Sequence, residues 1–316
     1  MHGSLYRYSR GLQAFESPAS HCFSSFCIFV GGLTDGLLAC SYVERLAEQC
    51  HKEGWALVQP VLSSSYAGFG TSSLDRDVDE IASLIEYLIG QRDAKQFALC
   101  GHSTGCQDAV HFLKNAPPAL RARVRAAILQ APVSDREANR EDVPSGPAWA
   151  AHGFSSPQQH AALLADAQSR VADGRGDEIL STRYFGFVPM TAARYAALSE
   201  RGGKDDYFSS DFSDDELRER LGHLSTLGQR IGPAGEAEPV VDHPGLRTLF
   251  VLSAADEYVP RNVEPQGLAR RFVVAAGGDG AADALIVPDA NHNLSEPETA
   301  AEVFVLAAAA LLASCK

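Results

Sequence analysis

The chain has 316 residues, of which 45% are hydrophobic and 21% are charged, and its formal net charge at pH 7 is −13. This length can bury a sizeable core, as one large α/β domain or as two smaller ones. The acidic balance disfavours binding to nucleic acid or to anionic lipid, because both need clustered Lys and Arg. No apolar run approaches the roughly 18 to 20 residues that span a bilayer, so membrane insertion is not expected either.

Strand-like and helix-like segments alternate along the chain. Apolar runs predict strands at 22–30, 55–62, 97–100, 124–132, 246–254 and 282–290. Apolar residues spaced by three or four positions predict helices at 37–52, 78–90 and 104–114, and a last helix at the C-terminus. Strands that alternate with helices indicate a mostly parallel central sheet flanked by helices on both faces.

Residues 135–245 break this alternation, because they are long, polar and helix-rich, with no convincing strand. An insertion between two strands of a sheet commonly forms a cap over the site. We therefore expect a core domain of residues 1–134 and 246–316, interrupted by a helical cap of residues 135–245. Within the cap, the capping-box pattern of Ser213 and Glu216 predicts the start of a helix.

The pentapeptide Gly101-His102-Ser103-Thr104-Gly105 stands between a predicted strand and a predicted helix. This context is typical of a nucleophile elbow, where the serine occupies a tight turn and bulky residues two positions away would clash. The turn lifts the hydroxyl to the carboxyl end of the sheet, and the helix N-terminus behind it favours developing negative charge. Ser103 is therefore the predicted nucleophile, and a plain strand-to-helix turn is the alternative.

A serine nucleophile needs a base and an acid to activate it. When the serine lies in a nucleophile elbow, the acid follows it along the chain and the histidine follows the acid. Six histidines follow Ser103, but only His292 comes after the last predicted strand and before the last helix, so it is the predicted base. Asp256, just past the strand at 246–254, is the predicted acid. Asp135, after the strand at 124–132, is its main rival. Two weaker candidates are Glu257 and Asp289.

The tetrahedral intermediate also needs two backbone amides to hold its oxyanion. The Thr104 amide, directly after the nucleophile, is predicted to be one of them. The Leu33 amide, in the loop after the first core strand, is predicted to be the other. The neighbouring Gly31 and Gly32 are small enough to let the main chain approach a substrate, although a simple turn would also explain them.

Substrate selectivity is expected in the cap and in the loop 63–71, because a triad and an oxyanion hole recognise only a carbonyl and its charge. The predicted substrate-binding residues are Gly32, Tyr66, Phe69 and Tyr207. Other cap aromatics are candidates to close over a ligand, and about half of the cap aromatics are expected to pack in the cap core instead. These other aromatics are Tyr184, Phe185, Tyr195 and Phe208.

Neither a metal nor an organic cofactor is expected. The seven cysteines form no CxxC pair and no cysteine–histidine set with zinc spacing. The segment Gly68-Phe69-Gly70 lacks the third glycine of a dinucleotide loop. The acidic run 204–216 lacks EF-hand spacing and predicts a solvated helix start, with a contact between cap and loop as the alternative.

The cysteines also bear on location. They stand in apolar segments, and the first 20 residues lack the continuous apolar core of a signal peptide. Together these features predict buried free thiols in a reducing cytoplasm.

With these residues in place, the chain resembles the α/β-hydrolase superfamily and, more narrowly, the DUF1749 family (the UPF0613 proteins), which is known mainly from fungi and plants. The resemblance rests on six blocks that cover most of the chain. They are FVGGLTDGLLA (29–39), LVQPVLSSSYAGFGTSSLDRDVDEI (57–81), LCGHSTGCQDAVHFL (99–113), ILQAPVSDREA (128–138), DDYFSSDFSDDEL (205–217) and LSAADEYVP (252–260).

The DUF1749 family includes fungal esterases that hydrolyse fusarinine-type siderophores inside the cell. The resemblance therefore implies an α/β-hydrolase fold and a carboxylic-ester hydrolase with Ser103, Asp256 and His292 as its triad. It implies a small-molecule ester as substrate. A thioesterase, a lipase, an amidase and a non-catalytic binding protein of the same fold are the alternatives.

Overall fold

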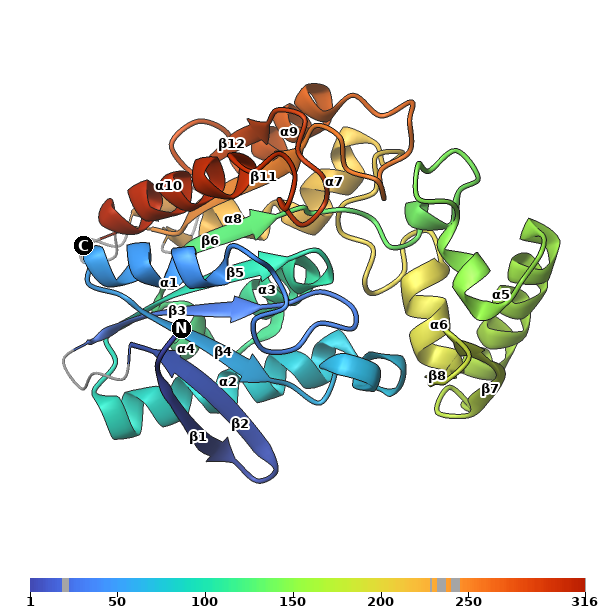
Figure 1. Cartoon of the computed structure of the whole chain (residues 1–316), viewed down its shortest axis with the longest axis horizontal. Helices are drawn as coiled ribbons and strands as arrows, with labels where there is room; N and C mark the ends of the chain where they lie inside the picture. The colour runs from blue at the N-terminus through green and yellow to red at the C-terminus, as the bar shows by residue number, and fades with distance from the viewer. Residues whose placement is uncertain (19–22, 228, 232–236, 240–244, 316) are drawn as a thin grey trace.

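The structure is a computed structural model, which describes residues 1–18, 23–227, 229–231, 237–239 and 245–315 (Figure 1). An eight-stranded sheet has the order β1-β2-β4-β3-β5-β6-β11-β12. The β1–β2 and β2–β4 pairs are antiparallel, and the other pairs are parallel. The strands are β1 (Ser4–Ser9), β2 (Leu12–Ser17), β3 (Ser25–Val30), β4 (Ala56–Val61), β5 (Gln96–His102), β6 (Val124–Gln130), β11 (Arg247–Ser253) and β12 (Ala282–Val287).

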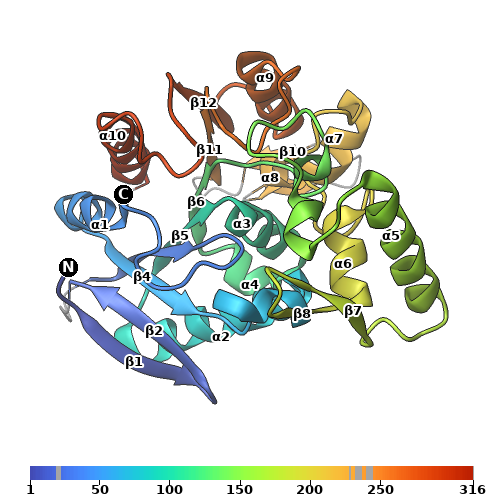
Figure 2. The same cartoon turned by 45° about the vertical axis from the view of Figure 1, so that its right-hand side comes forward.

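Both faces of the sheet are apolar, as expected for parallel strands covered by helices on each side. Along β3, Phe26 and Ile28 belong to the core that contains α2, α3 and α9, whereas Cys27 and Phe29 belong to the core that contains α1 and α10. Figure 2 shows α1 and α10 together on one side of the sheet. The helices of the two layers are α1 (Val43–Lys52), α2 (Leu74–Arg92), α3 (Thr104–Asn115), α4 (Pro118–Arg121), α9 (Pro265–Ala275) and α10 (Ala300–Ala313).

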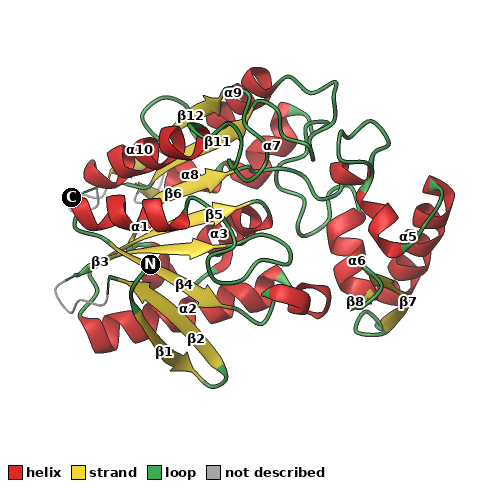
Figure 3. Cartoon of the chain, in the orientation of Figure 1, coloured by secondary structure: helices red, strands yellow, loops and turns green. Residues whose placement is uncertain are grey.

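The mostly parallel sheet with flanking helices is the predicted fold class, which is confirmed (Figure 3). The antiparallel hairpin β1–β2 at one edge was not among the predicted elements. Its two-residue turn contains Gly11 with φ 79°, a backbone conformation that glycine adopts readily. Among the described residues, no helix is both long and apolar enough to cross a membrane.

The insertion between β6 and β11 begins with a part that projects from the carboxyl end of the sheet, at the right of Figure 1. It contains η3 (Ala148–His152), α5 (Pro157–Ala172), β7 (Ile179–Tyr184), β8 (Val188–Thr191) and α6 (Ala192–Ser199). Residues of α5, β7, β8 and α6 form a small hydrophobic cluster of their own, and Phe69 from η1 (Tyr66–Thr71) packs into it. The projecting part thus contacts the core domain through the loop after β4.

The insertion differs from the expected strandless cap. Strands β7 and β8 form an antiparallel pair, as do the short strands β9 (Gln229–Ile231) and β10 (Ala237–Pro239). Strand β7 has a single buried position, Leu180, so its sequence shows no apolar alternation. The limits at 135 and 245 remain a prediction, and residues 240–244 lie outside the described residues.

The last part of the insertion returns to the core domain. Leu217 and Leu221 of α7 (Asp214–Leu221) and Leu224 of α8 (His223–Thr226) belong to the main core cluster. The predicted helix start is confirmed, because Ser213 and Glu216 form both hydrogen bonds of the capping box. Among the described residues of the insertion, the first part stands away from the sheet, whereas α7 and α8 pack on the core domain.

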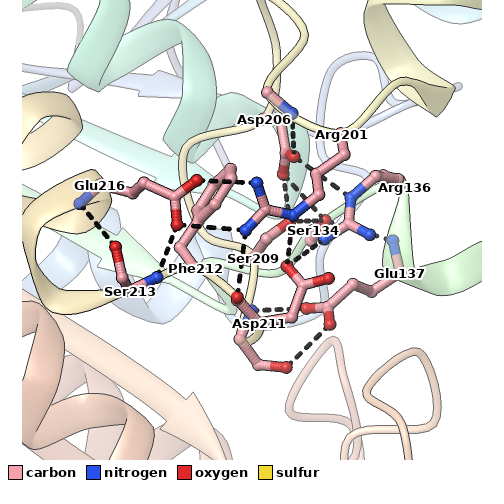
Figure 4. A network of polar contacts seen from close by, with 12 residues as sticks. Ser134, Arg136, Glu137, Arg201, Asp206, Ser209, Asp211, Phe212, Ser213 and Glu216 are labelled. Carbon is pink, nitrogen blue, oxygen red and sulfur yellow. Dashed lines mark hydrogen bonds and ion pairs between the residues drawn. The ribbon is translucent and has the colours of Figure 1, made fainter.

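A polar network ties the loop after β6 to the segment before α7 (Figure 4). The buried Asp206 accepts hydrogen bonds from Ser134 Oγ at 3.1 Å and from Arg136 Nε at 3.2 Å. Asp214, at the start of α7, is exposed. The second half of the acidic run 204–216 is therefore the solvated helix start that was predicted. Its first half instead makes a buried contact with the loop after β6.

Candidate active site

Ser103 lies at a sharp turn between β5 and α3, with φ 53° and ψ −124°. A positive φ is strained for a residue with a side chain. Close packing holds the turn in place: a Cβ at Gly105 would lie 2.2 Å from the Val30 oxygen, and one at Gly101 would lie 2.4 Å from the Gly105 oxygen. Both positions therefore require glycine, which explains the spacing of the motif.

His292 and Asp256 are joined by a hydrogen bond at the same end of the sheet. The Nδ1 of His292, after β12, lies 2.8 Å from Oδ2 of Asp256, after β11, and both side chains are buried. The Tyr258 amide donates to Oδ1 of Asp256 at 2.9 Å. The amide of His292 donates to Glu257 Oε2 at 2.8 Å. These bonds fix the orientation of the imidazole.

Asp135 occupies a different position. It lines the same cavity as Ser103 and His292, but its Oδ1 accepts a hydrogen bond from Thr104 Oγ1 at 3.2 Å. Burial raises the pKa of its carboxyl to about 6. Asp256, and not Asp135, is thus the carboxylate hydrogen-bonded to His292.

Two histidines that line the same cavity as Ser103 differ in their electrostatic surroundings. Burial lowers the pKa of His102 to about 3, and its Nδ1 bonds to Gln130 Oε1 at 2.5 Å. Burial also acts to lower the pKa of His292, but the charge and hydrogen bond of Asp256 outweigh it, so this pKa is raised. His292 is therefore suited to accept a proton, whereas His102 stays neutral.

Ser103 and His292 open onto one cavity of about 290 Å³. Its wall contains the predicted residues Gly32, Leu33 and Phe69. Cap aromatics complete it: these are Tyr184, Phe185 and Tyr195. Two further wall residues, His152 and Tyr258, were not predicted, although Tyr258 could have been found from its place two residues after Asp256.

The two predicted oxyanion amides belong to segments that meet at Ser103. Thr104 is the first residue of α3, and Leu33 lies in the loop after β3. That loop is closed by two hydrogen bonds, from the Gly32 amide to Asp35 Oδ2 at 2.8 Å and from the Asp35 amide to the Gly32 oxygen at 3.1 Å. A Cβ at Gly32 would lie 2.8 Å from Ser103 Cβ, so this glycine permits the close approach.

Two predicted substrate contacts lie elsewhere. Tyr207 is buried in the main core and bonds to His111 Nδ1 through its hydroxyl at 2.7 Å, because the chain has already returned to the core domain at this point. Tyr66 is 52% exposed, and its ring lies against Gly36. Neither tyrosine belongs to the cavity wall that the described residues form.

A larger cavity of about 540 Å³ lies on the other side of Val133 and Tyr258, which line both cavities. Asp256 lines it, but Ser103 and His292 do not. Of these two cavities, the smaller is the candidate active site, because the described residues that line it include both the serine and the histidine.

Several known proteins are similar to this chain over most of its length. A UPF0613 protein of Schizosaccharomyces pombe is 32% identical over 317 residues, which cover 94% of this chain and 92% of that protein. The fusarinine C esterase sidJ of Aspergillus fumigatus is 30% identical, over 94% of this chain and 91% of that protein. The solved structure of the siderophore hydrolase EstB from Aspergillus fumigatus is 28% identical, with a TM-score of 0.73, over 99% of this chain and 97% of that one.

These similarities establish an esterase-like α/β hydrolase. The profile of the DUF1749 family, described as a protein of unknown function, matches residues 1–312. The chain therefore belongs to the DUF1749 family, and its fold is the α/β-hydrolase fold.

Proposed function

We propose that this protein is a serine esterase that uses Ser103, His292 and Asp256 as a catalytic triad. The proposal rests on the 2.8 Å hydrogen bond between His292 Nδ1 and Asp256 Oδ2, together with the strained Ser103, which lines the same cavity as His292. A binding protein would have no need to hold a serine, an imidazole and a carboxylate in this order.

The steps follow from the positions of these groups. His292 takes the proton of the Ser103 hydroxyl as the oxygen attacks the ester carbonyl, and Asp256 stabilises the resulting imidazolium. The Leu33 and Thr104 amides hold the oxyanion. His292 then gives the proton to the leaving alcohol, and a water molecule, activated in the same way, releases the acid from Ser103. These steps need no metal or organic cofactor.

For the substrate, we propose a large multi-ester hydroxamate of the siderophore type. The support is the similarity to a fusarinine C esterase and to a siderophore hydrolase. A cavity of about 290 Å³ is at the lower end of the range of roughly 300 to 1,000 Å³ for small-molecule sites. One ester arm of such a substrate would therefore enter, while the rest lies at the rim near the cap.

A cytoplasmic location is also part of the proposal. The six cysteines among the described residues are buried free thiols, which suit a reducing compartment. Cell fractionation followed by immunoblotting tests this point, and recovery of the protein in the secreted fraction would contradict it.

The experiment for the activity compares wild type with Ser103→Ala on nitrophenyl esters and on ferric siderophores. We expect hydrolysis by wild type and none by the variant, at an unchanged melting temperature. Hydrolysis of short esters alone would support the esterase and remove the siderophore substrate. Retained activity in Ser103→Ala would remove the mechanism.

A further inference from the structure

Three side chains with metal-binding atoms gather in the wall of the active-site cavity. Asp35, Cys40 and His102 each offer one ligand atom, and these atoms lie within 4.8 Å of one another. Asp35 and Cys40 come from the loop after β3, and His102 ends β5. Cys40 and His102 are buried, and Asp35 is partly buried. They are not needed for the proton transfers proposed above.

Gln130 determines which nitrogen of His102 is available. The Nε2 of Gln130 donates to the His292 carbonyl oxygen at 2.9 Å, so its Oε1 must face His102 Nδ1 and the Tyr42 hydroxyl. His102 Nδ1 therefore carries the proton and donates it to Oε1. The Nε2 of the neutral ring keeps its lone pair. An imidazole whose second nitrogen is held in this way by a carbonyl is the usual form of a histidine metal ligand.

A second acceptor lies close to this nitrogen. Nε2 of His102 lies 4.0 Å from Oδ2 of Asp35, which already accepts the Gly32 amide at 2.8 Å. Two acceptors this close together in a partly buried wall repel, and a cation between them turns this repulsion into attraction. The sulfur of Cys40 completes the group and adds a soft ligand.

The ligand set favours zinc over other common ions. Imidazole, thiolate and carboxylate together are typical of Zn²⁺, whereas Mg²⁺ and Ca²⁺ prefer oxygen alone. Tetrahedral zinc with bonds of about 2.0 to 2.3 Å places its ligand atoms roughly 3.3 to 3.8 Å apart. The group needs to contract by less than about 1.5 Å to reach this spacing.

We propose that Asp35, Cys40 and His102 form a Zn²⁺ site whose fourth position faces the cavity, and that zinc bound there inhibits the enzyme. On binding, Cys40 releases its thiol proton to solvent and becomes a thiolate. Zinc adds positive charge beside His292, whose ring centroid is 5.1 Å from that of His102. This charge opposes the imidazolium that forms when Ser103 attacks. The inhibition rests on the proposed esterase activity, but the binding does not.

Cobalt, which binds in place of zinc, reports the binding directly. We expect metal-free wild-type protein, titrated with Co²⁺ alone, to show thiolate-to-cobalt charge-transfer absorption that saturates at one ion per chain. Cys40→Ser should lose this absorption. Cys315→Ser, which changes a cysteine of the C-terminal segment, should keep it. His102→Gln is the second variant, because it removes the Nε2 ligand while leaving an amide near Gln130.

Zinc inhibition is measured on a nitrophenyl ester, relative to the metal-free rate of each variant. We expect equimolar Zn²⁺ to lower the wild-type rate about tenfold or more, and to lower the rates of Cys40→Ser and His102→Gln far less. Absence of the cobalt absorption in folded wild type, or its persistence in Cys40→Ser, would overturn the site. If wild type binds cobalt but is not inhibited by zinc, the inhibitory role is wrong. If wild type binds cobalt but has no esterase activity, the proposed esterase function is wrong and the metal site stands.

Discussion

At the scale of single residues, the surroundings of a side chain decide its chemistry. His102 and His292 both line the same cavity as Ser103, but the hydrogen-bond partner of the His102 ring is a neutral amide and that of the His292 ring is a carboxylate. Asp256 and Asp135 both follow core strands, yet only Asp256 reaches the imidazole. In the histidine pair and in the aspartate pair, one residue makes the hydrogen bond between imidazole and carboxylate that catalysis requires, and the other serves as its control.

Substitutions distinguish the roles of the two aspartates. Asp256→Asn should lower kcat by about 10³- to 10⁴-fold, because the imidazole loses the carboxylate that stabilises its charged form. Asp135→Asn should lower kcat by less than about tenfold, because Asp135 bonds to Thr104 and not to His292. Steady-state kinetics on a nitrophenyl ester measures both. A larger loss in Asp135→Asn than in Asp256→Asn would reverse the assignment.

The pH dependence of kcat/KM reports on the charged groups near His292. Only the neutral imidazole accepts the serine proton, so kcat/KM falls as the pH falls through the pKa of His292. Because this pKa is raised, the midpoint should lie above the ordinary value of about 6.5. Glu257→Gln removes a negative charge that raises it and should move the midpoint to lower pH. Glu48→Gln, on the exposed face of α1, should leave it in place; an unchanged midpoint in Glu257→Gln would contradict this account.

At the scale of elements, the site is assembled from loops that leave one end of the sheet. The loops after β3, β5, β11 and β12 supply Leu33, Ser103, Asp256 and His292 in that order. Parallel strands make this possible, because their carboxyl ends meet at one edge. The cap then adds aromatic side chains to the cavity wall. We therefore expect the cap to determine selectivity between esters, whereas the loops of the core domain carry the catalytic residues.

Cap aromatics should differ in their effect on selectivity. Tyr184→Ala opens the cavity wall and should change the ratio of kcat/KM between a bulky and a small ester. Tyr207→Phe removes a buried hydrogen bond to His111, so it should lower the free energy of unfolding by about 1 kcal/mol without changing that ratio. Parallel kinetics and urea unfolding measure the two effects. A changed ratio in Tyr207→Phe would show that this tyrosine contacts the substrate after all.

At the scale of the whole molecule, the sequence predicts the layers of the core better than the parts that depend on distant contacts. Strands with long apolar runs, such as β6 and β11, and the elbow at Ser103 are recognisable because their patterns are local. The β1–β2 hairpin was missed because its residues mix apolar and polar types. The burial of Tyr207 and Asp206 depends on where the chain returns to the core, which spacing does not encode.

The gathering of Asp35, Cys40 and His102 shows the same limit. Zinc motifs are recognised when their ligands stand at short, regular spacing. Here two separate segments supply them, so only the fold brings them together.

Arg194 links the cap to the core domain. It is buried in α6, pairs with the buried Asp205, and donates from Nε to the Phe69 oxygen at 2.9 Å. Arg194→Met would leave the Asp205 charge uncompensated and should lower the free energy of unfolding by about 3 to 5 kcal/mol. Arg218→Met breaks an exposed pair with Asp215 and should have no measurable effect. Equal urea-unfolding midpoints for the two variants would show that Arg194 is not a structural link.

The central claim is that Ser103 is an activated nucleophile, and covalent labelling tests it most directly. Wild-type protein, treated with a fluorophosphonate and analysed by intact mass and peptide mapping, should gain one label, located on Ser103. Folded Ser103→Ala should gain none, and folded His292→Ala should react far more slowly, because the serine has lost its base. A folded wild type that takes up no label, or that is labelled on another residue, would contradict the account.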